Sequence, residues 1–264
     1  MNHNILFLVP TCELVKFNKK SVVVRCIKSI KKFYPLNKII IINDSPINVV
    51  SNKQIKTYFN NSTIDVVSPL TKGSACSFAM NYLYHTNYEY GIVIHDSTEL
   101  INHLPDLNFD IKFFWSFTEH FFWDGRRVPV AHKTKTIKTH KDEIFNLYIN
   151  LESSIFKNNF IDFFSKKKLW RGCMGNMMII SNKFLHHVEN ITKILSLTNF
   201  VVTRRDRMCM ESIFAMAVFY SKQFDLNSEF TYSLQGNWNK YNDPSYINYL
   251  GKNVIYIKKY HLKR

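Results

Sequence analysis

The first hundred residues alternate short apolar runs with longer amphipathic segments. Residues 5–9, 39–42 and 90–94 are apolar, and each run ends in polar or turn-forming residues. This pattern is typical of strands buried on both faces of a parallel sheet. Between the first two runs, residues 21–33 carry apolar side chains at helical spacing, which predicts a helix with one face against a sheet. The order of strand, helix and strand indicates a βαβ unit.

A third strand and a second helix continue this alternation. Residues 64–68 read as a short strand after a polar connection with weak helical character. The turn at 69–74 then leads into a helix expected to run through His85, with Ser74 available to cap it. Strands that alternate with helices in this way predict an α/β fold with a mainly parallel sheet.

The second part of the chain is less regular. Helical periodicity returns over 142–165, and a glycine-containing loop at 170–176 leads into an apolar strand at 177–180. Asn182 is expected to begin one helix, and another is expected after the basic segment 204–207. No internal repeat, low-complexity tract or linker interrupts the sequence, so we expect a single domain over residues 1–264.

Composition narrows the range of partners and compartments. The chain has 264 residues, a formal net charge of +15 and five cysteines. The charge indicates anionic partners: nucleic acid, phosphorylated molecules or an acidic membrane surface. The cysteines are odd in number and widely spaced, which favours a reducing compartment. The N-terminal apolar run is short for a signal peptide, and no stretch approaches the ~18 apolar residues of a membrane span. We expect a soluble, cytoplasmic protein.

Polar residues stand where the predicted strands end. Thr11 follows the first strand, Asp44 the second and Asp96 the fourth. Ligands of such sheets bind at the carboxyl ends of the strands, so these side chains are candidates for a binding site. Two alternatives remain open: Asp44 could close its own loop as an Asx-turn, and Thr11 could be a turn cap.

This arrangement resembles the inverting GT-A glycosyltransferases, such as glycosyltransferase family 2. The resemblance covers roughly residues 4–215 and implies a GT-A-like (Rossmann-like) fold with a mixed, mainly parallel sheet flanked by helices. It rests on the order of several short motifs: Pro10-Thr11, Asp44-Ser45, Lys72-Gly73-Ser74, Asp96, the loop 172–176 with the strand after it, and Glu211.

On the donor side, the resemblance implies that residues 1–100 bind a nucleoside-diphosphate sugar such as a UDP-sugar. Thr11, Asp44 and Lys72 would contact the donor, and Asp96 would lie at the diphosphate and at any Mn²⁺ or Mg²⁺. The family motif has two or three aspartates, whereas this chain has Asp96 alone. Either a metal binds through Asp96 with help from His95, or cations neutralise the diphosphate. The candidate cations are Lys72, Arg126, Arg204 and Arg205.

On the acceptor side, the resemblance implies that residues 101–264, with their basic C-terminal tail, bind a glycan, a lipid-linked sugar or a protein. The expected activity is hexosyl transfer or a related transfer. Glu211 is the first candidate for the catalytic base, at the start of a helix, and Asp206 is the second. The structural alternative is that Glu211 pairs with Arg207 on a solvated helix face. Trp170 is a candidate to stack on a sugar ring, or else a core residue.

Other functions remain in competition. A nucleic-acid-binding protein would fit the charge, but the cations are scattered and show no recognisable domain pattern. A nucleotidyltransferase would need a glycine-rich loop after the first strand, where residues 10–13 contain no glycine. A catalytically inactive nucleotide-binding protein with the same fold stays open. Basic residues also allow peripheral contact with a membrane.

Overall fold

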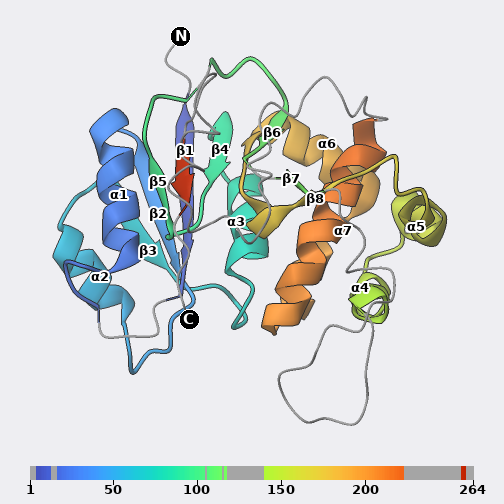
Figure 1. Cartoon of the computed structure of the whole chain (residues 1–264), viewed down its shortest axis with the longest axis horizontal. Coiled ribbons are helices and arrows are strands. Elements are labelled where there is room, and N and C mark those ends of the chain that lie inside the picture. Colours follow the sequence, from blue (N-terminus) through green and yellow to red (C-terminus); the bar gives the residue numbers. More distant parts are fainter. Residues whose placement is uncertain are drawn as a thin grey trace, which may run out of the picture.

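The structure is a computed structural model (Figure 1), and it describes residues 4–12, 17–104, 106–114, 116–117, 140–222 and 257–259. Its centre is a six-stranded sheet in the order β3-β2-β1-β4-β9-β6. The bounds of these strands are Ile64–Val67 (β3), Lys38–Asn43 (β2), Ile5–Thr11 (β1), Tyr90–Val93 (β4), Met178–Ser181 (β9) and Ile111–Phe113 (β6). Two short pairs lie outside the sheet: β5 (Thr98–Leu100) with β10 (Ile257–Lys259), and β7 (Ser116–Phe117) with β8 (Gly172–Cys173).

The sheet is mixed and mainly parallel, which confirms the predicted fold class. Strands β1 to β4 run parallel, while β9 runs antiparallel to both β4 and β6. The chain passes outward from β1 through β2 to β3 and then returns to the other side of β1 as β4. The strand order therefore reverses between β1 and β4, and in open α/β sheets that reversal opens a crevice at the carboxyl ends.

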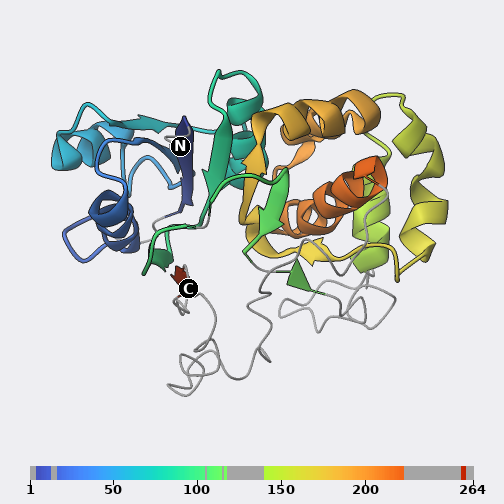
Figure 2. The same ribbon diagram turned by 90° about the horizontal axis from the view of Figure 1, so that it is seen from above.

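Helices cover both faces of the sheet. Their bounds are Val22–Phe33 (α1), Asn52–Phe59 (α2), Ala75–Tyr84 (α3), His140–Tyr148 (α4), Ile155–Ser165 (α5), Asn182–Thr192 (α6) and Arg204–Lys222 (α7), with 3₁₀ turns at Met174–Asn176 (η2) and Ile194–Phe200 (η3). Figure 2 shows α4 to α7 gathered at one end of the sheet and α1 and α2 at the other.

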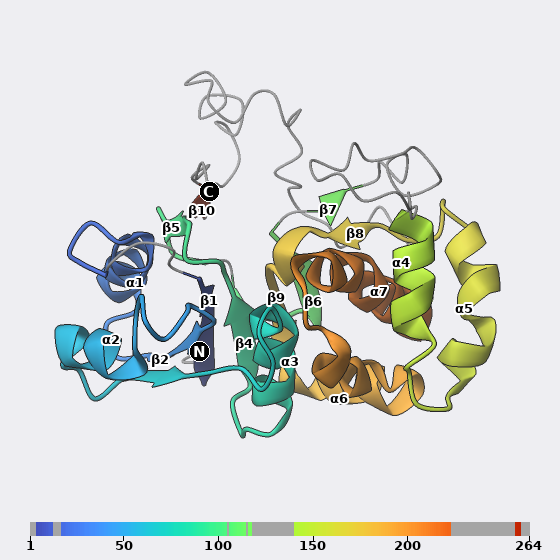
Figure 3. The same ribbon diagram turned by 90° about the horizontal axis from the view of Figure 1, so that it is seen from below.

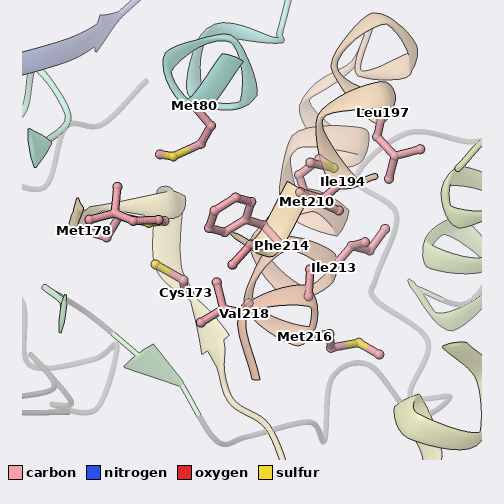
Figure 4. Close-up of a cluster of buried hydrophobic side chains, with 14 of the residues drawn as sticks. Met80, Cys173, Met178, Ile194, Leu197, Met210, Ile213, Phe214, Met216 and Val218 are labelled. Atoms are coloured by element: carbon pink, nitrogen blue, oxygen red, sulfur yellow. The ribbon is translucent and has the colours of Figure 1, made fainter. Parts of the chain in front are cut away.

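The strands read as continuous apolar runs because both of their faces are buried. Leu6 and Leu8 of β1 join a core with α3 and α7, whereas Phe7 and Val9 join a core with α1 and α2. Figure 4 shows part of the first core, where Phe214 of α7 lies among side chains from α3, β8 and β9. Burial of this kind stabilises a fold by roughly 25 cal/mol per Å² of apolar surface.

Most predicted elements are confirmed within two residues at each end. Two predictions of helix boundaries were wrong. The periodic stretch 142–165 contains two helices, because Ser154 starts a new one by accepting a hydrogen bond from the backbone N–H of Lys157 at 3.1 Å. The last helix starts at Arg204, inside the basic segment, because Thr203 and Asp206 cap it there.

The division between the donor-binding part (residues 1–100) and the acceptor-binding part (residues 101–264) falls inside the central sheet. Strands β6 and β9 belong to the second half of the chain, and β9 hydrogen-bonds to β4 of the first half. Among the described residues, no helix combines the length and the apolar character needed to cross a membrane.

Candidate functional site

The polar ends of three neighbouring strands meet at one edge of the sheet. The Thr11 hydroxyl donates to Oδ2 of Asp96 at 2.9 Å, and the backbone N–H of Asp96 donates to the Pro10 carbonyl at 3.1 Å. The backbone N–H of Asp44 donates to the Thr11 carbonyl at 2.8 Å. Thr11, Asp44 and Asp96 are buried, with exposed fractions of 2%, 9% and 4%. The structure therefore brings these three predicted residues together where the strand order reverses.

Asp44 holds a loop from elsewhere in the chain. The backbone N–H of Gly73 lies 3.0 and 2.9 Å from the two carboxylate oxygens of Asp44. Gly73 has a φ of +92°, and a Cβ there would lie 3.3 Å from the backbone of Val202 and Thr203. Asp44 thus fixes the loop that carries Lys72 against the segment before α7.

An Asx-turn was the alternative predicted for Asp44, but Asn43 forms the turn at this place. Oδ1 of Asn43 accepts from the backbone N–H of Ser45 at 3.1 Å, and Nδ2 donates to the Val50 carbonyl at 3.2 Å. The local-turn interpretation of Asp44 was therefore wrong. The sequence reasoning missed Asn43, although an Asn at a strand end is itself a turn signal.

Two cations act on Asp44. Burial raises the pKa of its carboxyl, while the Gly73 N–H bond and the charges of Arg207 and Lys72 lower that pKa in part. Lys72 is exposed on the loop and Arg207 is half-buried on α7. Both cations therefore favour the ionised form of Asp44 at this edge of the sheet. Sequence reasoning considered Arg207 only as a partner of Glu211.

His95 connects the end of β4 to the glycine loop. Its Nε2 lies 2.8 Å from the Gly175 carbonyl and 3.4 Å from Sγ of Cys76. A carbonyl only accepts, so this bond requires a proton on Nε2, and that nitrogen cannot serve as a metal ligand at the same time. Gly175 has a φ of +62°, and a Cβ there would lie 2.2 Å from Cε1 of His95. Glycine is required for this contact.

Glu211 lies on the buried side of α7. Its exposed fraction is 7%, so the predicted alternative of a solvated helix face was wrong. It lies two turns inside the helix rather than at its start. Burial first, and then the charge of Glu211, raise the pKa of the Cys173 thiol on β8. Residues four apart share a helix face, so Arg207 and Glu211 lie on one side of α7, the helix that packs against η2 and β8.

Asp206, the second candidate base, caps α7. Its Oδ2 accepts from the backbone N–H groups of Val202 at 3.1 Å and Thr203 at 2.8 Å, and from the Thr203 hydroxyl at 2.8 Å. The carboxylate thus satisfies backbone donors that would otherwise lack partners at a helix start. Its catalytic role stays a prediction.

The acidic residues of the site do not form a metal centre by themselves. Within the described ranges, no group of three or more His, Cys, Asp or Glu side chains could hold a metal ion. Oδ2 of Asp96 accepts from the Thr11 hydroxyl and, at 3.4 Å, from the backbone N–H of Cys12. The residues present therefore do not fit a metal held by the protein alone.

Trp170 is a core residue. Its side chain is 1% exposed, packs against Phe164 and donates from Nε1 to the Phe164 carbonyl at 3.4 Å. Its predicted role in sugar stacking was wrong. Arg126, the candidate cation of the middle segment, lies outside the described residues.

Comparisons with known proteins give matches among solved structures alone. No protein-family model matches the chain, and no curated protein matches its sequence. Among solved structures it is similar to Staphylococcus aureus TarS, with a TM-score of 0.41 and 11% identity over 83% of this chain and 34% of that one. A structure of TarS 1-349 gives a TM-score of 0.41 and 12% identity over 83% of this chain and 56% of that one. This chain therefore spans about a third and just over half of the two TarS chains.

Proposed function

We propose that the protein is a glycosyltransferase that moves a sugar from a nucleoside diphosphate to an acceptor hydroxyl with inversion at the sugar carbon. One observation carries this proposal. Buried Thr11, Asp44 and Asp96 meet where the strand order reverses, and the charge of Arg207 on α7 acts on Asp44. A buried carboxylate is costly unless it has partners or a function, and here two lie at the edge where such sheets bind nucleotides.

The donor would bind along the sheet edge, with UDP as the first nucleotide to test. A carboxylate has about four acceptor sites, so Asp44 can hold Gly73 and still accept from a ribose hydroxyl or a base N–H. Thr11 lies beside it on β1. Lys72 and Arg207, whose charges act on Asp44, would lie near the diphosphate.

The acceptor would bind between the glycine loop and α7. The Glu211 carboxylate takes the proton from the acceptor hydroxyl as that oxygen attacks the anomeric carbon. The bond from this carbon to the diphosphate breaks, and the nucleoside diphosphate leaves with the electron pair. Lys72 and Arg207 stabilise the negative charge that develops on the leaving group. A single displacement inverts the sugar carbon.

Any Mn²⁺ or Mg²⁺ would lie at Asp96, because such ions accept one or two carboxylates together with substrate phosphates. No step of the proposed reaction depends on it. The acceptor would be a glycan, a lipid-linked sugar or a protein. All five cysteines are free thiols, which supports a reducing compartment such as the cytoplasm.

A thermal-shift panel tests the donor site without knowledge of the acceptor. Nucleoside diphosphates and nucleotide sugars are added with Mn²⁺, with Mg²⁺ and with EDTA, since a ligand of the folded state raises its melting temperature. We expect a selective shift that is lost in Asp44→Ala and kept in Asp162→Ala, an exposed acid on α5. Survival of the shift in EDTA would show that donor binding needs no metal.

Two outcomes would contradict the proposal. A shift with oligonucleotides but with no nucleotide would favour a nucleic-acid-binding protein. A nucleotide shift without transfer or donor hydrolysis, across acceptors of all three classes, would favour an inactive nucleotide-binding protein.

A further inference from the structure

Two loops join beside the crevice and form one continuous surface. The Thr71 hydroxyl donates to the Val201 carbonyl at 2.8 Å, and the Cβ position of Gly73 is 3.3 Å from the backbone of Thr203. In Figure 1 the loop into α3 and the N-terminal end of α7 lie side by side at the lower edge of the molecule. Figure 3 shows α3 and α7 from below. We call this surface the rim, and its members are Leu70, Lys72, Phe200, Val202, Arg204 and Met208.

The rim exposes large apolar side chains. The exposed fractions are 68% for Leu70, 54% for Val202, 46% for Phe200 and 38% for Met208. Single exposed apolar residues are ordinary on a protein surface, but several on two adjoining segments are typical of an interaction site. Water is a poor environment for such a group, so a partner that covers it gains free energy.

Cations alternate with these apolar residues. Lys72 and Arg204 are exposed, and each stands two residues after an exposed apolar residue, Leu70 and Val202. Two acids lie close by: Asp206 directs its Oδ2 to the backbone at the start of α7, and buried Asp44 holds the Gly73 N–H. Arg205 is not a member of the rim, because it pairs with Glu143 at 2.6 Å. The rim is thus both apolar and basic.

We infer that the rim docks the protein onto a lipid bilayer that contains anionic phospholipids. Apolar side chains enter the boundary between headgroups and acyl chains, while neighbouring cations contact lipid phosphates. The net charge of +15 complements such a surface. Docking would turn the crevice toward an acceptor carried in the membrane. That consequence rests on the proposed function, whereas the docking itself does not.

Co-sedimentation with vesicles tests the inference. We compare phosphatidylcholine vesicles with and without phosphatidylglycerol, and expect binding only to the anionic ones, weakened by salt. Arg204→Gln should weaken binding about fivefold, the loss expected for one cation near an anionic surface. The double variant Leu70→Ser/Val202→Ser should weaken it about tenfold or more, because both side chains would lose their apolar environment.

A matched variant controls for a general loss of apolar surface. Ile155→Ser/Ile161→Ser changes two exposed side chains of α5, which are 68% and 55% exposed. It should bind vesicles as the wild type does. All the substituted side chains are exposed, and unfolding curves confirm that each variant is folded.

Three results would overturn the inference: equal binding to both kinds of vesicle, unchanged binding of the rim variants, or an equal loss in the α5 variant. Self-association that the rim variants abolish, without vesicle binding, would make the rim an interface between copies of this chain. Vesicle binding does not require sugar transfer, so this inference and the proposed function can fail separately.

Discussion

The sheet wall of the candidate site, which holds Thr11, Asp44 and Asp96, and its helical wall, formed by η2 and α7, are built differently. On the sheet wall, Thr11, Asp44 and Asp96 are hydrogen-bonded across strands and loops. On the wall formed by η2 and α7, the side chains of Asn176 and Ser212 are fully buried and have no hydrogen-bond partner within the described residues. The sheet wall is therefore organised by hydrogen bonds, and the helical wall mainly by packing and the His95–Gly175 contact.

This difference has a consequence for substitutions. Changes on the sheet wall should affect stability and donor binding together, because the same bonds hold the fold and shape the site. Changes to Glu211 should affect chemistry with little effect on stability.

The largest effect is expected at Glu211. Glu211→Gln keeps the shape of the side chain but removes the base, and should lower the transfer rate by about 10³-fold. Donor binding, followed by thermal shift, should be unchanged. Glu152→Gln, at an exposed position, is the control and should be fully active. Wild-type activity in Glu211→Gln would rule this residue out as the base.

Gly175→Ala should destabilise the protein by about 3 kcal/mol, since it combines a positive φ with a Cβ only 2.2 Å from the His95 ring. Urea unfolding measures the loss. Adding His95→Ala should recover part of it by removing the overlap. Gly91→Ala is a useful comparison, because the atoms nearest to its Cβ belong to the Leu83 side chain and its φ is not positive, so it should cost less. If the losses in unfolding free energy from His95→Ala and Gly175→Ala simply added, the His95–Gly175 contact would be contradicted.

Thr11→Val should destabilise the protein by about 2 kcal/mol, because it leaves the buried Asp96 carboxylate without its hydroxyl donor. Donor affinity should fall as well. Thr198→Val is a matched control, since the Thr198 hydroxyl is buried without a partner within the described residues and its removal should be neutral or stabilising. Equal effects of the two substitutions would show that the Thr11–Asp96 hydrogen bond adds no stability.

The smallest effect concerns pH. Burial raises the pKa of Asp44 above its ordinary value of 3.8, so the folded state holds this proton more tightly than the unfolded chain. The contribution of Asp44 to stability should therefore be most favourable at low pH and be lost as pH rises through the raised pKa. Asp44→Asn should lack this fall as pH rises above about 4, measured by urea unfolding. A fall in stability of the same size in the wild type and in Asp44→Asn would show that Asp44 is not its cause.

The sequence predicted the sheet wall well because its signals are local. Apolar runs closed by polar residues specify strands and their ends, and adjacency of Thr11, Asp44 and Asp96 then follows from parallel pairing. The start of α7 was predicted wrongly, although Thr203 and Asp206 stand at capping spacing and indicate it.

The helical wall could not be predicted in the same way. The contact of His95 with Gly175 joins residues 80 positions apart, and nothing in the sequence near His95 tells which loop lies beside it. Likewise, the effect of Arg207 on Asp44 depends on how α7 crosses the sheet edge. Such long-range placement depends on packing of the whole core, which local patterns do not encode.

The most direct test of the account is an NMR titration with the nucleoside diphosphate that gives the largest thermal shift. We predict that the largest changes in backbone amide shifts occur at Thr11, Gly73 and Asp96, at the carboxyl edge of the sheet. A separate hollow at the opposite edge is lined by Asn37, Lys38, Thr63 and Tyr88, among others. Amide-shift changes concentrated at this hollow, with Thr11 and Asp96 unaffected, would contradict the proposed donor site.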